Sequence, residues 1–392
     1  MRTATVCILL LLALAHVAIA DDDLTVRDDG DATASEVAAA EARARLANVE
    51  VGAAADTDAV KAASSRPDIG DTSGMSLIEW LTALGMPPPA LNVSAEVRFG
   101  AVTNQAVPAG RNLIELPLAS VMSTTTAAQS ALRPFFEEHG AQIPATVALA
   151  LHVMYEADVL PAQGTPSFWG PYLRALPAGF DTPLFWNQTE LNELVGSSAL
   201  ATVAERLRTL EQDYGQLRGV LVDQLALFSA EQFTFQRYAW ATSVVWARSI
   251  MVSTGTGNGT AMEPVLVPVL DGLQHDHRVN TSLRVDEAGQ RLVFAATQDY
   301  AEAGSPVLIN WGERPNAVLL LNQGYVTTDN PYDYVTMSIR MSEDDPQHGM
   351  KMKMLAQLGL DANDTYLLRN DQSEAQMVPE ARIVISLSVY LL

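Results

Sequence analysis

Two groups of short extended segments stand on either side of a long helical stretch in this 392-residue chain. Residues 95–122 alternate between apolar and polar side chains, which predicts short strands, among them Gln105–Gly110 and Leu113–Pro117. Residues 127–250 have the apolar spacing of helices, and residues 265–310 return to strands. This order predicts an α+β fold in which a helical insertion splits a β-rich core.

Several helices can be placed by their apolar period and their end signals. The first is an amphipathic helix from Ser76 to Leu84, which Gly85 closes. Further helices are predicted at Pro144–Ala157, Gln188–Val195, Ala199–Asp213, about Ala230 to Met251, and Met350–Leu358, the last preceded by a strand after Val335. No internal repeat is visible.

The N-terminus has the pattern of a secretory signal. Arg2 supplies the positive start, Val6–Val17 is a short apolar run broken only by His16, and Ala18-Ile19-Ala20 matches a cleavage site. Residues 1–20 are therefore predicted to be a signal peptide. The run is too short to span a bilayer comfortably, so no stable membrane insertion is expected after cleavage.

Composition adds limits on location and partners. Residues 21–70 are rich in Ala, Asp and Glu, which predicts a disordered acidic tail. Sequons at Asn92, Asn187, Asn258, Asn280 and Asn363 fit a glycoprotein, secreted or in the endoplasmic reticulum lumen. A plastid destination through a bipartite signal remains open.

The net charge of −22 disfavours nucleic acid as a partner. The single cysteine, Cys7, lies in the signal, so no disulfide or Cys-ligated metal is expected after cleavage.

Four sequence blocks follow one another within residues 76–390, the part of the chain on which a comparison with a known family depends. They are Arg98-Phe99-Gly100 with Val107-Pro-Ala-Gly110; Ser167-Phe-Trp-Gly-Pro-Tyr-Leu173 with Asp181-Thr-Pro-Leu-Phe-Trp186; Tyr238-Ala-Trp-Ala241 with Trp246-Ala-Arg-Ser249; and residues 268–324, which contain Asp271-Gly-Leu-Gln-His275, Ile309-Asn-Trp-Gly312 and Asn322-Gln-Gly324.

In this order the blocks resemble the SET-domain protein methyltransferases, and most closely the subgroup of the Rubisco large-subunit lysine methyltransferase and the actin-histidine methyltransferases. The resemblance implies a SET domain over residues 76–325 with its helical insertion at about 127–250. It also implies that residues 326–392 are a truncated helical substrate-binding region. The cofactor it implies is S-adenosylmethionine, the partner is a protein substrate, and no metal is expected. We expect a monomer.

The resemblance assigns roles to individual residues. Arg98 and Phe99 resemble the hairpin that packs along the methyl donor, and Arg248 matches the arginine that pairs with the donor's carboxylate. Asp271, Gln274 and His275 stand in the block that holds the adenine and amino ends of the donor. Gln323 falls where relatives contact cofactor or substrate.

Two positions depart from the family. Gln274 replaces an asparagine and keeps the amide, whereas Trp311 replaces the tyrosine whose hydroxyl contacts the transferring methyl group. An indole N–H can only donate a hydrogen bond. Trp311 either still forms an aromatic wall while another tyrosine takes over, or the chain is an inactive homologue.

The histidine-directed relatives have an asparagine where this chain has Ile250. An isoleucine side chain cannot hydrogen-bond an imidazole, so a lysine target is favoured. Two functions therefore stay open. One is a protein-lysine N-methyltransferase acting on a non-histone protein, and the other is a catalytically inactive SET-like protein-binding module in the secretory pathway.

Overall fold

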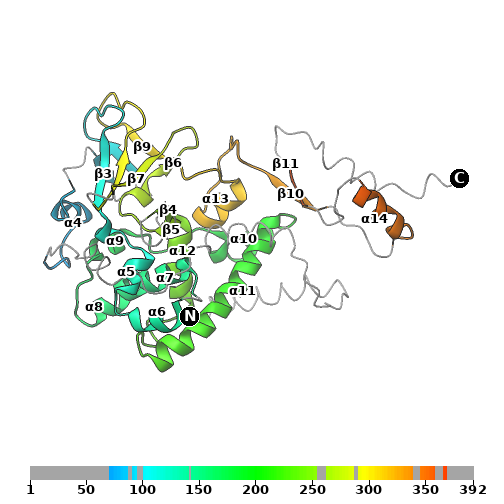
Figure 1. Cartoon of the computed structure of the whole chain (residues 1–392), viewed down its shortest axis with the longest axis horizontal. Helices are drawn as coiled ribbons and strands as arrows, with labels where there is room; N and C mark the ends of the chain where they lie inside the picture. Colours follow the sequence, from blue (N-terminus) through cyan, green and yellow to red (C-terminus); the bar gives the residue numbers. More distant parts are fainter. Residues whose placement is uncertain are drawn as a thin grey trace. The chain divides into compact units, whose positions relative to one another are not determined.

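The computed structural model describes residues 70–86, 91–94, 100–140, 143–253, 262–286, 290–338, 345–357 and 365–368 (Figure 1). These residues form two compact units. The larger unit takes the described residues of Arg43–Asp181 and Leu207–Gly312, and the smaller unit takes those of Thr182–Arg206 and Glu313–Leu392. The predicted signal peptide lies outside the described residues, as does the acidic tail apart from Gly70.

Two sheets make up most of the β-rich part of the larger unit. In order of pairing, the first holds β1 (Leu91–Ser94), β2 (Gly100–Thr103), β9 (Pro306–Ile309) and β6 (Gln274–His275), and the second holds β3 (Asn112–Pro117), β8 (Arg291–Ala295) and β7 (Ser282–Asp286). Among the described strands of these two sheets, only β6 and β9 pair in parallel. A separate antiparallel pair joins β4 (Ile250–Ser253) and β5 (Met262–Val265). Both sheets combine strands from before and after the helical stretch, which confirms the predicted α+β fold.

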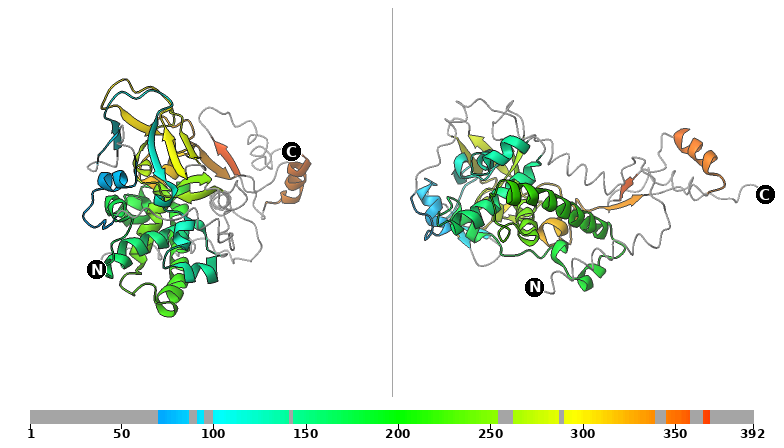
Figure 2. Two further views of the ribbon diagram at one scale, coloured as in Figure 1. Left: turned by 60° about the vertical axis from the view of Figure 1, so that its left-hand side comes forward. Right: turned by 90° about the horizontal axis from the view of Figure 1, so that it is seen from below.

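The helical part of the larger unit lies to one side of these sheets (Figure 2). It contains α4 (Leu77–Ala83), η1 (Leu118–Ser120), α5 (Thr124–Ala128), α6 (Arg133–His139), α7 (Ala145–Met154), the π-helical turn η3 (Tyr155–Val159), α8 (Leu160–Ala162), α9 (Gly170–Ala175), the π-helical turn η5 (Gly219–Gln224) and α12 (Phe235–Arg248). The long α11 (Ser198–Arg218) leads into η5. Helix α7 packs against α12 and is buried on nearly all sides, because its residues are almost all apolar.

The predicted opening helix is confirmed, and its start has a local cause. The Glu79 N–H donates to Ser76 Oγ (3.3 Å), and the Ser76 N–H donates to Glu79 Oε2 (2.8 Å). This reciprocal capping box satisfies N–H groups that the first helical turn leaves without partners. Trp80 and Leu81 are then buried, and Gly85 ends the helix with a left-handed φ of 72°.

Two local predictions were wrong. The segment Gln105–Gly110 forms a turn in which Val107 makes one isolated bridge, because Pro108 has no N–H to extend the pairing. Helix α12 begins at Phe235 rather than near residue 230, because the hydroxyl of Thr234 accepts the Arg237 N–H (3.3 Å) and caps it there.

The smaller unit contains a small apolar core. Leu191, Val203 and Leu321 are buried in it. Leu191 lies on α10 (Gln188–Asn192), Val203 on the first part of α11 and Leu321 on α13 (Asn316–Gln323), and η4 (Pro183–Phe185) belongs to the same unit. The unit also contains β10 (Val335–Ser338), α14 (His348–Gln357) and β11 (Thr365–Leu368), and β10 pairs with β11 antiparallel. Across the described ranges of the chain, no helix has both the length and the apolar character needed to cross a bilayer.

Candidate functional site

The end of α12 places Arg248 against the turn that contains Asp271. Ser249 takes an extended conformation and stops the helix, so Arg248 stands in its last turn, where a positive charge is favourable. Its Nη1 donates to the backbone carbonyl of Asp271 at 3.3 Å. The structure thus brings together two residues that the sequence assigned to the cofactor site.

The backbone before Asp271 is strained. Val269 has φ 73° and ψ −48°, a γ-turn geometry that a β-branched residue rarely adopts. It leads directly into the 3-10 turn η6 (Leu270–Gly272), in which the Asp271 N–H donates to the Val267 carbonyl at 3.0 Å. Strain of this kind persists where the surrounding structure holds it, and it concentrates at functional sites.

Asp271 is a buried carboxyl group with two polar neighbours. It is 7% exposed, and this burial raises its pKa to about 6, while Arg248 and the hydroxyl of Tyr172 act in the opposite direction. Tyr172, on α9, is 2% exposed and donates its hydroxyl to Asp271 Oδ2. Burial and the charge of Asp271 raise the pKa of Tyr172 well above its usual value, so the hydroxyl remains a donor at neutral pH.

Strand β6 carries Gln274 and His275 to the edge of the first sheet, where they pair with Leu308 and Ile309 of β9. The backbone N–H of Trp311 donates to Nδ1 of His275 at 3.1 Å. Nδ1 therefore accepts, and the neutral ring carries its proton on Nε2. The Gln274 side chain lies against β2, since a side chain added at Gly100 would place its Cβ 3.6 Å from Gln274 Nε2.

Trp311 is half-buried, and its indole is oriented by the backbone. Its Nε1 donates to the carbonyl of Leu273 at a long 3.4 Å. The indole N–H, which can only donate, is therefore directed to a main-chain acceptor. Tyr300, which precedes Trp311 in the sequence, is itself buried, and its hydroxyl is hydrogen-bonded to Gln298 and to the Leu308 backbone.

The other predicted site residues differ in their placement. Ile250 is half-buried in β4, two residues after Arg248, and pairs with Val265 of β5. Gln323 is half-buried at the end of α13 in the smaller unit. Arg98 and Phe99 lie outside the described residues.

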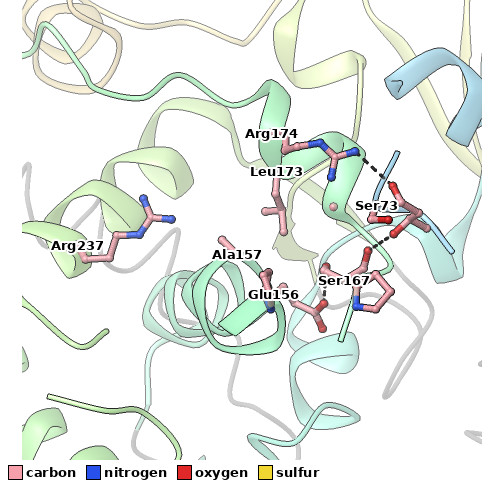
Figure 3. A pocket seen from close by; sticks show the side chains of 11 residues that line it. Ser73, Glu156, Ala157, Ser167, Leu173, Arg174 and Arg237 are labelled. Atoms are coloured by element: carbon pink, nitrogen blue, oxygen red, sulfur yellow. Dashed lines mark hydrogen bonds between the residues drawn. The ribbon is translucent and has the colours of Figure 1, made fainter. Parts of the chain in front are cut away.

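A separate pocket of about 360 Å³ lies on another side of α9 (Figure 3). The buried carboxylate of Glu156 accepts the Ser167 hydroxyl there at 2.6 Å, and Arg174 donates to the Thr72 and Met75 carbonyls at 3.3 and 2.7 Å. Arg237 also lines the pocket and forms a bidentate pair with Asp158 (2.6 and 2.8 Å). The bonds of Arg174 fasten residues 72–75 to α9, and the other bonds join segments within the insertion.

The cluster therefore consists of Arg248, Asp271, His275 and Trp311, with Gln274 beside them. A guanidinium at a helix end, an imidazole of fixed tautomer, an amide and an aromatic wall suit a ligand that has both a carboxylate and a heteroaromatic ring. Sequence reasoning missed Tyr172. It stands in the aromatic block quoted above, but no sequence pattern pairs it with Asp271.

No family model matches the sequence. The chain is 26% identical over 298 residues to the actin-histidine N-methyltransferase of Mus musculus, a match that covers 74% of this chain and 48% of that protein. It is 27% identical over 282 residues to the enzyme of that name from Danio rerio, covering 70% and 45%. The chain thus spans about half the length of the curated relatives it matches.

Solved structures show the same likeness in three dimensions. The SET domain of LSMT bound to lysine and AdoHcy superimposes with a TM-score of 0.61 at 20% identity, covering 79% of this chain and 69% of that one. Rubisco LSMT bound to AdoMet gives a TM-score of 0.60 at 18% identity, with the same coverage. The predicted resemblance to SET-domain protein methyltransferases of this subgroup is therefore confirmed, and the fold of the chain is that of a SET domain.

Proposed function

We propose that the chain is an S-adenosylmethionine-dependent protein methyltransferase. The observation that carries the proposal is the contact between Arg248 Nη1 and the Asp271 carbonyl (3.3 Å), beside the His275–Trp311 pair. Solved structures with this fold have AdoMet or AdoHcy bound, and the hydrogen-bonding groups of the cluster fit such a ligand. When bound, the cofactor supplies an electrophilic methyl group.

The residues of the chain would bind the methyl donor, orient it and exclude water from it. Arg248 would hold the carboxylate of the donor in a charge-assisted hydrogen bond. His275 and Gln274 would border its adenosine end, and the ring of Trp311 would close one side of the channel. Methyl transfer is an in-line displacement, so alignment in a dry channel supplies most of the rate.

A lysine of a non-histone protein is the target we propose. Ile250 follows Arg248 by two residues and offers no hydrogen bond to an imidazole. A dry aromatic channel would favour the neutral amine that must attack. Matched peptides that differ only in a lysine or a histidine, incubated with the methyl donor and analysed by mass spectrometry, test this choice. Methylation of the histidine peptide alone would overturn it, and Ile250→Asn should increase histidine methylation.

The second candidate is a SET-like protein-binding module without catalysis. Two observations favour it: Trp311 stands where the resemblance implies a tyrosine, and Gln274 is exposed rather than enclosed. Such a module would retain a peptide groove and need no methyl donor.

Calorimetric titration of S-adenosylmethionine into the purified protein separates the two functions. Micromolar binding that Arg248→Ala weakens by about a hundredfold, the loss expected for a charge-assisted contact, supports the enzyme. Arg208→Ala is the matched control, because Arg208 is exposed and bonds only Gln212 among the described residues. A folded protein that binds no donor at millimolar concentration supports the binding module instead.

The proposal includes a location. The signal-like N-terminus and the sequons favour the secretory pathway, with the plastid as the alternative. Expression of the full chain with a C-terminal tag, followed by N-terminal sequencing of the product, tests it. Cleavage after Ala20 is the expected result, and an intact Met1 in a cytosolic product would contradict it.

A further inference from the structure

Tyr172 is a polar group of the larger unit that the proposed methyl-transfer site leaves unexplained. It belongs to the helical insertion, whereas Asp271 belongs to the β-rich part, and 99 residues separate them. A tyrosine hydroxyl buried to this degree normally has a defined hydrogen-bond partner. Here the partner is a carboxylate that also faces the donor-binding arginine.

The helix that carries Tyr172 is held on several sides. Trp169, just before α9, donates its Nε1 to the Ser120 carbonyl at 2.7 Å. At the other end of α9, Arg174 donates to the carbonyls of Thr72 and Met75 at the pocket shown in Figure 3. Gly170 is tightly packed as well, since an added Cβ would lie 3.1 Å from Arg174 Nη1. The hydroxyl of Tyr172 is thus presented by a fixed helix.

We propose that Tyr172 is a positioning residue of the cofactor site: its hydroxyl fixes the Asp271 carboxylate, and through Asp271 it sets the place of the Arg248 guanidinium. The proposal rests on the proposed function and deepens it. Asp271 is the link, because its carboxylate accepts from Tyr172 while its backbone carbonyl accepts from Arg248. The backbone at Val269, strained at φ 73°, stands two residues before Asp271, where these two contacts meet.

The charge of Asp271 makes the arrangement sensitive to pH. The titratable and charged groups that act on this carboxyl are Tyr172 from α9 and Arg248 from the end of α12. With Tyr172 present, Asp271 is ionised at neutral pH and attracts Arg248. Without the hydroxyl, the buried carboxylate loses a hydrogen bond and its pKa rises further. The neutral acid then no longer attracts the guanidinium by charge, and only the backbone carbonyl of Asp271 still accepts from Arg248.

The test is a double-mutant cycle on donor binding with Tyr172→Phe, Asp271→Asn and the combined variant at about pH 7.5. Phe keeps the ring and its packing. We expect Tyr172→Phe to weaken S-adenosylmethionine binding about tenfold, the effect of one hydrogen bond to a charged group. The Asp271→Asn background lacks the charge that attracts Arg248, so there the same change should cost less than about twofold, although the amide oxygen still accepts the hydroxyl. Tyr238→Phe is the control. It removes the hydroxyl of a different buried tyrosine, on α12, and should leave the affinity for S-adenosylmethionine unchanged.

A pH profile separates positioning from a general packing role. Donor affinity of the parent protein should decline below about pH 6, and the midpoint in Tyr172→Phe should lie higher by about one pH unit. Additive losses in the cycle, or identical midpoints, overturn the role of Tyr172 and leave the proposed function standing. A parent protein that binds no donor overturns the proposed function itself.

Discussion

The backbone N–H of Trp311 holds His275 by donating to its Nδ1 across 3.1 Å. The orientation of the imidazole is therefore independent of which aromatic residue stands at position 311. The indole makes its own bond to the Leu273 carbonyl at 3.4 Å. In the proposed site, a tryptophan in place of the tyrosine that the resemblance implies would therefore keep the contact to His275 and change the wall of the channel.

A Trp311→Phe variant should bind the methyl donor almost as well as the parent protein. It keeps an aromatic wall and the N–H bond to His275, but it leaves the Leu273 carbonyl without the indole donor. We expect the free energy of unfolding to fall by about 1 kcal/mol, because the indole bond is long. Urea titration gives the stability and calorimetry gives the affinity. An affinity loss above about tenfold would show that the indole itself contacts the donor.

An Asp271→Asn variant should become relatively more stable as the pH rises. Asp271 has a pKa raised to about 6 by burial, against 3.8 for its ordinary value. The folded state thus binds the proton more tightly, and the stability this gives is complete below pH 3.8 and lost as the pH rises through 6.

Urea unfolding of both proteins checks the sign of this effect. As the pH rises from about 4.5 to about 7.5, the free energy of unfolding of the variant should increase by about 2 kcal/mol relative to that of the parent protein. Asparagine can still accept the Tyr172 hydroxyl, so packing is preserved. A difference that stays constant with pH would show that Asp271 titrates normally.

Much of the fold could be predicted because its signals are local. The capping box at Ser76 and Glu79 and the alternation that became β3 depend on neighbouring residues. The order of strands, helices and strands followed from the apolar period. The start of α12 was missed because Thr234, one hydroxyl, outweighs a longer apolar pattern.

The site could be predicted only in part, because its contacts join distant segments. The resemblance identified Arg248 and Asp271, and the structure brings them to 3.3 Å. The pairing of Tyr172 with Asp271 and the bond from the Trp311 indole to Leu273 depend on how the insertion and the sheets pack. No local propensity contains that information.

An Asn316→Ala variant should loosen the segment that follows α13. The Asn316 amide donates to the Thr327 carbonyl (2.9 Å) and to Asp333 Oδ2 (3.0 Å), and its oxygen accepts the Thr327 N–H (3.1 Å). The same oxygen also accepts from the Thr327 hydroxyl (3.4 Å) and the Asn330 amide (3.2 Å). Removing these bonds from a half-buried site should lower the free energy of unfolding by about 2–3 kcal/mol. Asn322→Ala, which removes a single acceptor from Arg206, should cost less.

Hydrogen exchange localises this effect. The Thr327 amide should lose protection in Asn316→Ala, while α12 in the larger unit should keep it. Unchanged protection at Thr327 would contradict a role for Asn316 in holding this segment.

Asn187 should carry an N-glycan if the chain enters the secretory pathway. It is exposed, and its Oδ1 caps α10 by accepting from the N–H groups of Thr189 (2.9 Å) and Glu190 (3.2 Å). Neither bond uses Nδ2, the atom to which a glycan attaches. The cap and the glycan can therefore coexist on one side chain.

Three variants separate the two roles of this residue. Asn187→Asp and Thr189→Ala both remove the sequon and keep a capping oxygen, so each should lose the glycan mass and retain stability. Asn187→Gln should lose both the glycan and the cap, and loss of the cap should lower the free energy of unfolding by about 1 kcal/mol. Glycosidase treatment with mass spectrometry, followed by thermal unfolding of the deglycosylated proteins, measures both effects. A full-length protein from eukaryotic cells with no glycan at Asn187 would count against the secretory location, and equal stability of all variants would count against the cap.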